Sequence, residues 1–245
     1  MTSCRNIVVF LGPTLRHARA EQLLDARFRP PAAMGDITRA VVDDFDTIVL
    51  IDGVFESGPS VWHKEILWAL SRGVTVIGAS SMGALRAAEL ADHGMTGYGT
   101  VFEAFASGRL EDDDEVAVLH GPAETGWAAL TDAMVDIRGY ADMACESGLL
   151  NAHQAAQVIR HAKGEHFKRR SFLLSCKAVM GTHSADIADW HSTLPCGIKE
   201  TDCSNLLANM SSVISAAETR LKNVPAFSPT VYLSRLQEFG FQFQH

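Results

Sequence analysis

The chain has 245 residues, of which 47% are hydrophobic and 20% are charged, a composition typical of a folded globular protein rather than a disordered one. Its formal net charge of −8 argues against general binding of DNA or RNA, which requires a basic surface. No apolar run approaches the ~20 residues that a membrane-spanning helix needs, and the run at residues 7–11 is too short for a secretory signal. We therefore expect a cytoplasmic protein with no membrane or nucleic-acid partner.

Strands and helices are predicted to alternate in the first half of the chain. Three continuous apolar runs, each ended by turn residues, predict buried strands at residues 6–11, 47–51 and 74–77. Helices are predicted between and after them, at residues 14–27, 59–71 and 81–93, with Thr14 placed to cap the first. This alternation predicts an α/β fold with a mostly parallel sheet flanked by helices.

Beyond residue 94 this alternation breaks down. An acidic run at residues 111–115 leads into an apolar segment, residues 116–119, for which we predict one more strand. From residue 127 to about 221 the apolar residues recur at helical spacing, with a break around residues 191–197. We therefore predict an α/β core over residues 1–122 and a mainly helical region over residues 123–245, packed on the core.

Cysteines and charged clusters are the candidate ligands for a metal or an anion. The five cysteines are widely spaced and include no C-x-x-C pair, so we predict no disulfide framework, metal site or cofactor. The carboxylates of residues 112–115 fit a Mg²⁺ site, but we favour a solvated loop. The basic segment at residues 166–172 (HFKRRSF) fits an acidic partner or a phosphate, but we favour a solvated helix face.

Between the third predicted strand and its helix the chain reads GASSMG, which places Ser81 at a strand-to-helix turn. The spelling ASSMG resembles the nucleophile elbow G-x-S-x-G, with Ala79 in the first glycine position. In a parallel sheet such a turn lies at the carboxyl edge, where ligands bind. The N–H groups of Met82 and Gly83 have no acceptor within the helix and are candidate donors to an oxyanion. The alternative is that Ser80 or Ser81 only caps the helix.

A serine nucleophile needs a base, and the preceding predicted helix offers His63 and Lys64. Lys64 shares a helical stripe with three apolar residues, where desolvation would favour the neutral amine that a base must be. His63 lies about 100° around the helix. Spacing does not decide which of them faces Ser81, and a snorkelling lysine and a surface histidine are the structural alternatives. Asp52, at the carboxyl end of a strand, is predicted to orient a catalytic group.

Two long motifs, VWHKEIL at residues 61–67 and GASSMGALRAAEL at residues 78–90, resemble the core of TfuA-like proteins. More of that pattern occurs in the same order: FLGPT, PPAAMGD and LIDGVF precede these motifs, and GMTGYG, DDEVAV and AMVDIR follow them. The resemblance spans roughly residues 7–138, whereas residues 145–245 carry little of it.

The resemblance implies a partner of YcaO enzymes, which activate a peptide backbone amide with ATP. It implies that the TfuA-like protein hydrolyses a thiocarboxylate on a ubiquitin-like sulfur carrier of the ThiS type, and so supplies sulfide for thioamide formation in a precursor peptide. The family's proposed active site is a Ser–Lys pair, and the matching residues are Ser81 and Lys64. The resemblance therefore favours Lys64 over His63 as the base.

Three points stay open in this interpretation. A thiocarboxylate is already anionic, so a cation or proton donor is needed near its sulfur. Arg86 need not face the site, and His63 is taken as the candidate for this role. Ser80 stands where the family often has another small residue, so it competes with Ser81 for the nucleophile role. The alternative function is a non-catalytic adaptor that binds the YcaO enzyme and its peptide, and a weaker one is nucleotide binding through the FLGPT or GMTGYG loop, neither of which spells a known fingerprint.

Overall fold

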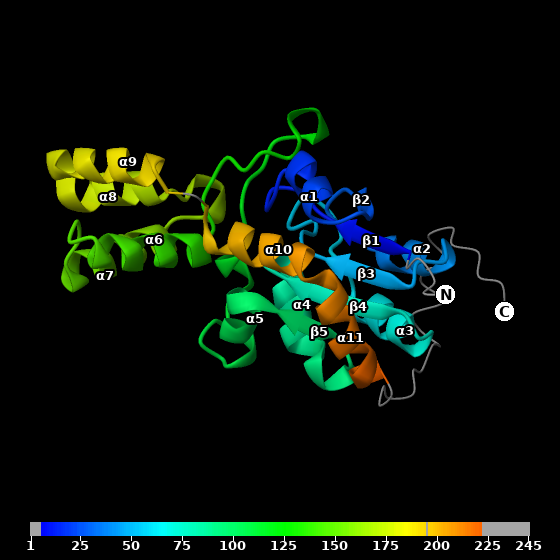
Figure 1. Cartoon of the computed structure of the whole chain (residues 1–245). Helices are drawn as coiled ribbons and strands as arrows, with labels where there is room; N and C mark the ends of the chain where they lie inside the picture. Colours follow the sequence, from blue (N-terminus) through cyan, green and yellow to red (C-terminus); the bar gives the residue numbers. More distant parts are fainter. Residues whose placement is uncertain (1–5, 195, 222–245) are drawn as a thin grey trace.

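The structure is a computed structural model that describes residues 6–194 and 196–221. Its centre is a sheet of five strands in the order β2-β1-β3-β4-β5, and every neighbouring pair is parallel (Figure 1). The strands are β1 (Ile7–Phe10), β2 (Arg27–Arg29), β3 (Thr47–Leu50), β4 (Thr75–Ala79) and β5 (Thr96–Tyr98). The predicted α/β class with a parallel sheet is confirmed.

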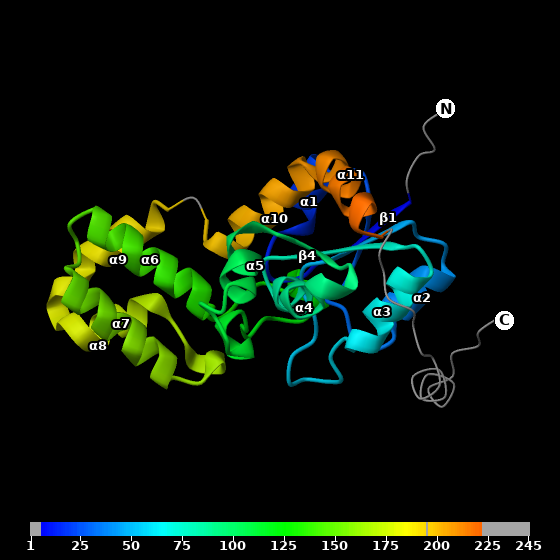
Figure 2. The ribbon, with the colours of Figure 1, turned by 90° about the horizontal axis from the view of Figure 1, so that it is seen from below.

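Helices cover both faces of this sheet (Figure 2). Alternate strand residues point to opposite faces, so Val8 and Ile48 pack with one layer of helices, and Val9 and Val49 pack with the other. The first layer consists of α2 (Asp36–Val42), α3 (His63–Ser71) and α4 (Met82–Leu90). The second consists of α1 (His17–Leu23), α10 (Ile198–Ala208) and α11 (Met210–Leu221). The middle strands are therefore buried on both sides, which explains their continuous apolar sequences.

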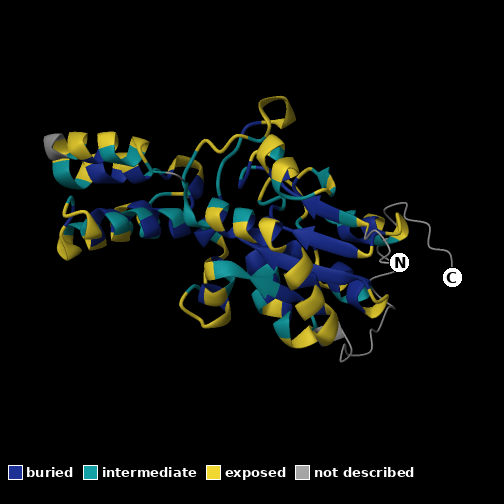
Figure 3. Cartoon of the chain, viewed as in Figure 1, coloured by how far each residue is buried: buried dark blue, intermediate teal, exposed yellow. Residues whose placement is uncertain are grey.

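Four helices form a helical lobe that projects from the sheet (Figures 1 and 3). They are α6 (Met134–Glu146), α7 (Ala152–Gly164), α8 (Phe172–Met180) and α9 (Ala185–Ser192), and they have a hydrophobic core of their own. After α9 the helical pattern is interrupted, as the sequence predicts, and the chain then returns to the sheet as α10 and α11. The region predicted to be helical is therefore divided between the separate lobe and the layer of helices on the sheet. The domain boundary near residue 122 stays a prediction.

Most predicted elements occur, with shifted ends. The strands predicted at residues 47–51 and 74–77 are β3 and β4, and the helix predicted at residues 81–93 is α4 with a 3₁₀ turn, Ala91–His93. The predicted helix at residues 59–71 begins only at His63. The first helix is shorter than predicted, and Thr14 does not cap it, because its hydroxyl is bonded to Asp52 and Arg16 stands at the N-cap.

The strand predicted at residues 116–119 is wrong. This segment instead packs against α4, α5 (Gly99–Ala106) and the start of α6, and its Leu119 N–H donates to the Thr131 hydroxyl rather than to a strand. Residues 127–133 were expected to be helical but form the loop before α6. In the described ranges, no helix is long and apolar enough to cross a membrane.

Candidate functional site

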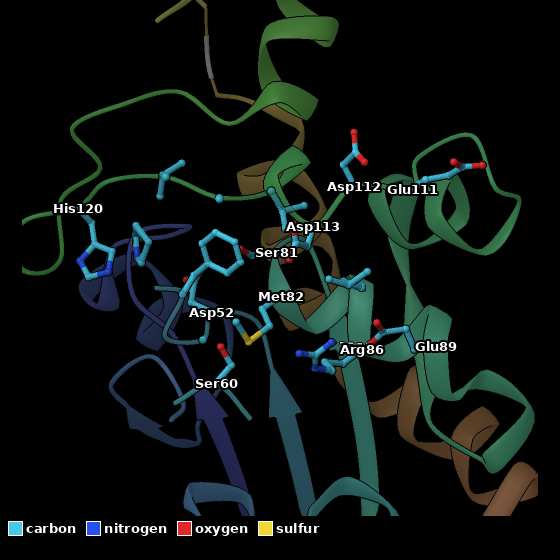
Figure 4. Close-up of a pocket in the computed structure, with 17 residues that line it drawn as sticks. Asp52, Ser60, Ser81, Met82, Arg86, Glu89, Glu111, Asp112, Asp113 and His120 are labelled. Atoms are coloured by element: carbon cyan, nitrogen blue, oxygen red, sulfur yellow. Dashed lines mark hydrogen bonds and ion pairs between the residues drawn. The ribbon is translucent and has the colours of Figure 1, made fainter. Parts of the chain in front are cut away.

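A pocket of about 420 Å³ opens at the carboxyl edge of the sheet. Pro13 reaches it from the end of β1, Asp52 from the end of β3 and Ser81 from the end of β4. Because β1 is followed by β2 on one side and has β3 on the other, the strand order reverses here, which is where α/β sheets bind ligands. In Figure 4, Ser81 lies in the middle of the pocket, His120 on one side, and Arg86 and Glu89 on the other.

The turn between β4 and α4 presents Ser81 rather than Ser80 to this pocket. Ser80 has φ +65°, and the N–H of Ser81 donates to Ala79 O at 2.7 Å, so Ser80 is the centre of a strained γ-turn. The Ser80 hydroxyl is fully buried and has no partner in the described part of the chain. Ser81 is 7% exposed, lines the pocket, and its hydroxyl makes neither a helix cap nor any other hydrogen bond with a described residue. The interpretation of Ser81 as a helix cap is therefore wrong.

The two predicted oxyanion donors differ in availability. The Gly83 N–H donates to Ile51 O at 3.1 Å, so Gly83 is not free to bind an oxyanion, and that prediction is wrong. A Cβ at Gly83 would overlap the carbonyl oxygen of Leu50, which shows how closely α4 approaches β3. The Met82 N–H has no acceptor among the described residues, and Met82 also lines the pocket. It remains the candidate donor, with the N-terminal end of α4 behind it.

Lys64 does not lie on a buried stripe of α3. The helix begins at His63, so Lys64 occupies its first turn, where it is exposed. Neither Lys64 nor His63 lines the pocket that contains Ser81. The expected desolvation of Lys64 is therefore wrong, and its pairing with Ser81 stays a prediction.

Arg86 lines the pocket although its spacing from Ser81 did not single it out. On α4, Met82, Arg86 and Glu89 recur at helical spacing, and all three line the same pocket. The Arg86 side chain is 15% exposed; its Nη1 donates to Glu89 Oε2 at 2.6 Å and its Nε to Val61 O at 3.3 Å. A guanidinium is thus held in the pocket that Ser81 lines, whereas the sequence analysis took His63 as the candidate for this charge.

Glu89 links this arginine to His63. The same Oε2 atom lies 2.8 Å from His63 Nε2, so one carboxylate oxygen contacts both side chains. Burial acts to raise the pKa of Glu89, but the hydrogen bonds from His63 and Arg86 outweigh it and lower the pKa below its ordinary value. His63 does not line the pocket itself; among the described residues it is connected to the site through Glu89.

Asp52 fixes the loop that follows β1. Its Oδ2 accepts from Gly12 N at 2.9 Å and from Thr14 N at 3.1 Å, and its Oδ1 accepts from the Thr14 hydroxyl at 2.6 Å. The carboxylate is buried and lines the pocket. In the described structure it orients backbone, and its predicted role toward a catalytic side chain stays a prediction.

His120 is a pocket residue that the sequence did not indicate, because an isolated histidine after an apolar run has no distinguishing pattern. Its Nδ1 lies 2.8 Å from Gly121 O, a contact in which the ring nitrogen must be the donor. In the neutral ring, Nε2 is then left with a lone pair. His120 is therefore a second candidate for proton transfer.

The acidic run holds an internal cation. Lys163 Nζ lies 3.0 Å from Asp112, 2.5 Å from Asp114 and 3.0 Å from Glu115, whose carboxylates are close enough together to hold a metal ion. The ammonium group of Lys163 thus occupies the centre that a metal ion would take. Arg138 pairs with Glu115 and Arg170 with Asp114, so the favoured solvated loop is wrong for Asp114 and Glu115.

The basic segment also differs from the expected solvated face. Arg170 is buried and donates to Ala162 O, Asp114 and Glu165 O. Lys168 pairs with Glu56 at 3.0 Å, and Phe167 packs edge-on against Phe55 with the ring centroids 5.4 Å apart. The segment therefore ties the helical lobe to the loop after β3, which forms one wall of the pocket.

Comparison with family models identifies residues 52–171 as a match to the family described as TfuA-like protein. The matched part begins at Asp52, includes the Ser80–Ser81 turn and α4, and extends through the acidic run into the helical lobe. A comparison with curated proteins finds no match.

Proposed function

Because the chain belongs to the TfuA-like protein family through residues 52–171, we propose that it hydrolyses a thiocarboxylate on a ThiS-type sulfur carrier. The sulfide would serve a YcaO enzyme that forms a thioamide in the backbone of a precursor peptide. The single observation that carries the hydrolase proposal is the Ser81 hydroxyl, which lines the pocket at the carboxyl edge without a partner among the described residues.

In the proposed reaction, Ser81 Oγ forms a bond to the thiocarboxylate carbon and gives its proton to a base. The base passes this proton to the sulfur as the C–S bond breaks, and hydrosulfide leaves with the electron pair, so that an acyl ester on Ser81 remains. Water attacks this ester, the carrier leaves as a carboxylate, and Ser81 regains its proton. The sum is thiocarboxylate plus water giving carboxylate plus hydrogen sulfide, with no oxidation or reduction.

Two groups in the pocket would stabilise the negative charge that this reaction involves. The Met82 N–H points from the first turn of α4, where an oxyanion on the attacked carbon would be stabilised by a backbone donor. Arg86 supplies a cation for the thiocarboxylate sulfur or oxygen. It takes the place for which His63 was the candidate, since His63 is separated from the pocket by Glu89.

The base is proposed from the resemblance to be Lys64, and His120 competes for the role. Lys64 is exposed outside the pocket, so it would have to fold over the pocket mouth when the carrier binds. His120 lines the pocket without any rearrangement. Comparing Lys64→Met with His120→Gln assigns the base, because only the variant that lacks it loses acyl transfer while still binding the carrier.

The test is sulfide release from a thiocarboxylated carrier, measured for the wild type, Ser81→Ala and Ser80→Ala. We expect Ser81→Ala to lose at least about 10²-fold in rate, because the covalent route is removed, and Ser80→Ala to keep most activity. Ser80→Ala is a matched control, since it removes the neighbouring hydroxyl without touching the pocket. A folded wild type that releases no sulfide above buffer would rule out the hydrolase.

The adaptor remains the second candidate, and the helical lobe favours it. This lobe has its own core and supplies no residue to the Ser81 pocket, so its outer surface is free for another task. A pure adaptor predicts that Ser81→Ala keeps the whole effect on thioamide formation by the YcaO enzyme. A hydrolase predicts that the effect is lost when carrier thiocarboxylate is the sole sulfur source and is restored by added sulfide.

A further inference from the structure

The rim of the Ser81 pocket carries two carboxylates that have no ion-pair partner within the described part of the chain. Within the acidic run, Asp112, Asp114 and Glu115 share the ammonium group of Lys163. Glu111 and Asp113 line the same pocket, are exposed, and have no ion-pair partner in residues 6–194 and 196–221. A net negative charge is therefore left on this wall of the pocket.

The inner part of the pocket differs from the rim because it contains a hydroxyl and a guanidinium. Ser81 is 7% exposed and its hydroxyl has no partner among the described residues, so it is available to a polar group of a ligand. Arg86 lines the same pocket; its Nη1 and Nε already donate to Glu89 and Val61 O, and its Nη2, which has no partner among the described residues, is left for an anion. In Figure 4, Asp113 lies above Ser81, and Glu111 and Asp112 lie farther out on the same side. The pocket lining thus combines one guanidinium, Arg86, which is partly paired with Glu89, with the carboxylates of Glu111 and Asp113 on another wall.

The size of the pocket restricts what can enter it. A volume of about 420 Å³ corresponds to roughly 7 Å across, which two or three extended residues span at about 3.4 Å each. A folded carrier therefore inserts only the end of its chain. Residues a few positions before that end would then lie at the rim, next to Glu111 and Asp113.

We propose that this pocket selects a chain terminus that ends in a carboxylate or thiocarboxylate and carries cationic side chains a few residues before it. Arg86 receives the terminal anion, and Glu111 and Asp113 attract the lysine or arginine side chains upstream. This deepens the hydrolase proposed above by naming the charge pattern of its substrate. An acidic tail would meet like charges on the rim and be rejected.

The test measures binding of short fluorescein-labelled peptides that end in two glycines and a free carboxylate. One peptide carries two lysines before the glycines and the other carries two glutamates. We expect the lysine peptide to bind the wild type about tenfold more tightly, since two exposed ion pairs together account for a factor of this order. High salt should reduce this preference, because exposed charge pairs are screened.

Variants separate the rim from the inner group. The double variant Glu111→Gln/Asp113→Asn should bring the two peptides to within twofold of each other. The control Glu124→Gln/Glu146→Gln changes the net charge by the same amount at exposed positions outside the pocket and should keep the preference. A lysine peptide with a terminal amide should bind the wild type more weakly than the same peptide with a free carboxylate. The two peptides should bind Arg86→Met equally well.

Two results would overturn this charge pattern: no measurable preference in the wild type, or a preference that survives in Glu111→Gln/Asp113→Asn. Peptide binding requires no catalysis, so its outcome is independent of sulfide release. Absent sulfide release with an intact lysine preference refutes the hydrolase and leaves the recognition standing. Sulfide release at equal rates from carriers with lysine and glutamate tails refutes the recognition and leaves the hydrolase standing.

Discussion

Glu65 is buried where α3 meets the start of α2, and we expect it to make the protein less stable as the pH rises toward 7. Its Oε2 accepts from Gly35 N at 2.8 Å and its Oε1 from Trp62 N at 3.1 Å. Burial, the largest influence, raises its pKa to about 7, although these backbone hydrogen bonds act in the opposite direction. The native protein therefore favours the protonated carboxyl group.

The magnitude follows from the shift. An unfolded glutamate ionises near pH 4.5, so between pH 4.5 and 7 the native state holds a proton that the unfolded state has lost. Stability then falls with rising pH by up to about 1.4 kcal/mol per unit, which gives roughly 3 kcal/mol over this interval. Above pH 7 both states are ionised and the contribution is constant.

The assay is urea unfolding of the wild type and Glu65→Gln at pH 5 and pH 7.5. Glutamine cannot ionise, and its amide nitrogen faces one backbone N–H, so we expect the variant to be less stable at pH 5 by about 1–3 kcal/mol. At pH 7.5 the gap should close or reverse, because only the wild type has lost stability. Glu146→Gln, an exposed glutamate on α6, is the control. A difference between wild type and Glu65→Gln that stays constant within about 0.5 kcal/mol across the two pH values would refute the reasoning.

Three other perturbations test the contacts around the pocket. Gly83→Ala should destabilise the protein by about 2–3 kcal/mol in urea unfolding, because its Cβ would overlap the carbonyl oxygen of Leu50 and break the bond from Gly83 N–H to Ile51 O. Unchanged stability would contradict the close approach of α4 to β3. Lys163→Met should cost about 1–2 kcal/mol at low salt, since it leaves three carboxylates together, and added Mg²⁺ should restore part of the loss; an unchanged midpoint would show that the cluster contributes nothing. Arg86→Met should raise the KM for thiocarboxylated carrier by about tenfold, whereas an unchanged KM in a sulfide-release assay would remove Arg86 from substrate binding.

The sequence predicted the central strands because their neighbours bury them on both faces. Residues 47–50 and 75–79 form β3 and β4, where continuous apolar runs are a strong signal. β2 and β5 were not predicted, since each has only three residues and they read RFR and TGY. Residues 116–119 show the reverse case: an apolar run that is buried against helices rather than paired in the sheet. An apolar run indicates that a segment is buried, but whether it pairs with strands or packs against helices depends on the tertiary structure.

In the candidate site, too, the sequence predicted local structure but not which residues lie next to one another. The position of Ser81 after a buried strand follows from local pattern, and so does its place at the carboxyl edge. Which side chains surround it depends on where each helix begins and how it is rotated. A start at His63 instead of residue 59 leaves Lys64 exposed, and the rotation of α4 turns Arg86 into the pocket. His120 comes from a loop more than thirty residues away from Ser81 in sequence, so no local spacing could relate them.

The return of α10 and α11 to the sheet affects how the protein folds during translation. The face formed by Val9, Val49 and Ile77 is covered by residues 203–217, which the ribosome releases only after the whole helical lobe has been synthesised. A nascent chain that already contains all five strands therefore has only α1 on this side of the sheet, and the part that α10 and α11 cover stays exposed for more than a hundred residues of elongation. Incomplete chains that end before α10 should be the aggregating species, so chaperone demand during translation should depend on the last two helices rather than on the sheet.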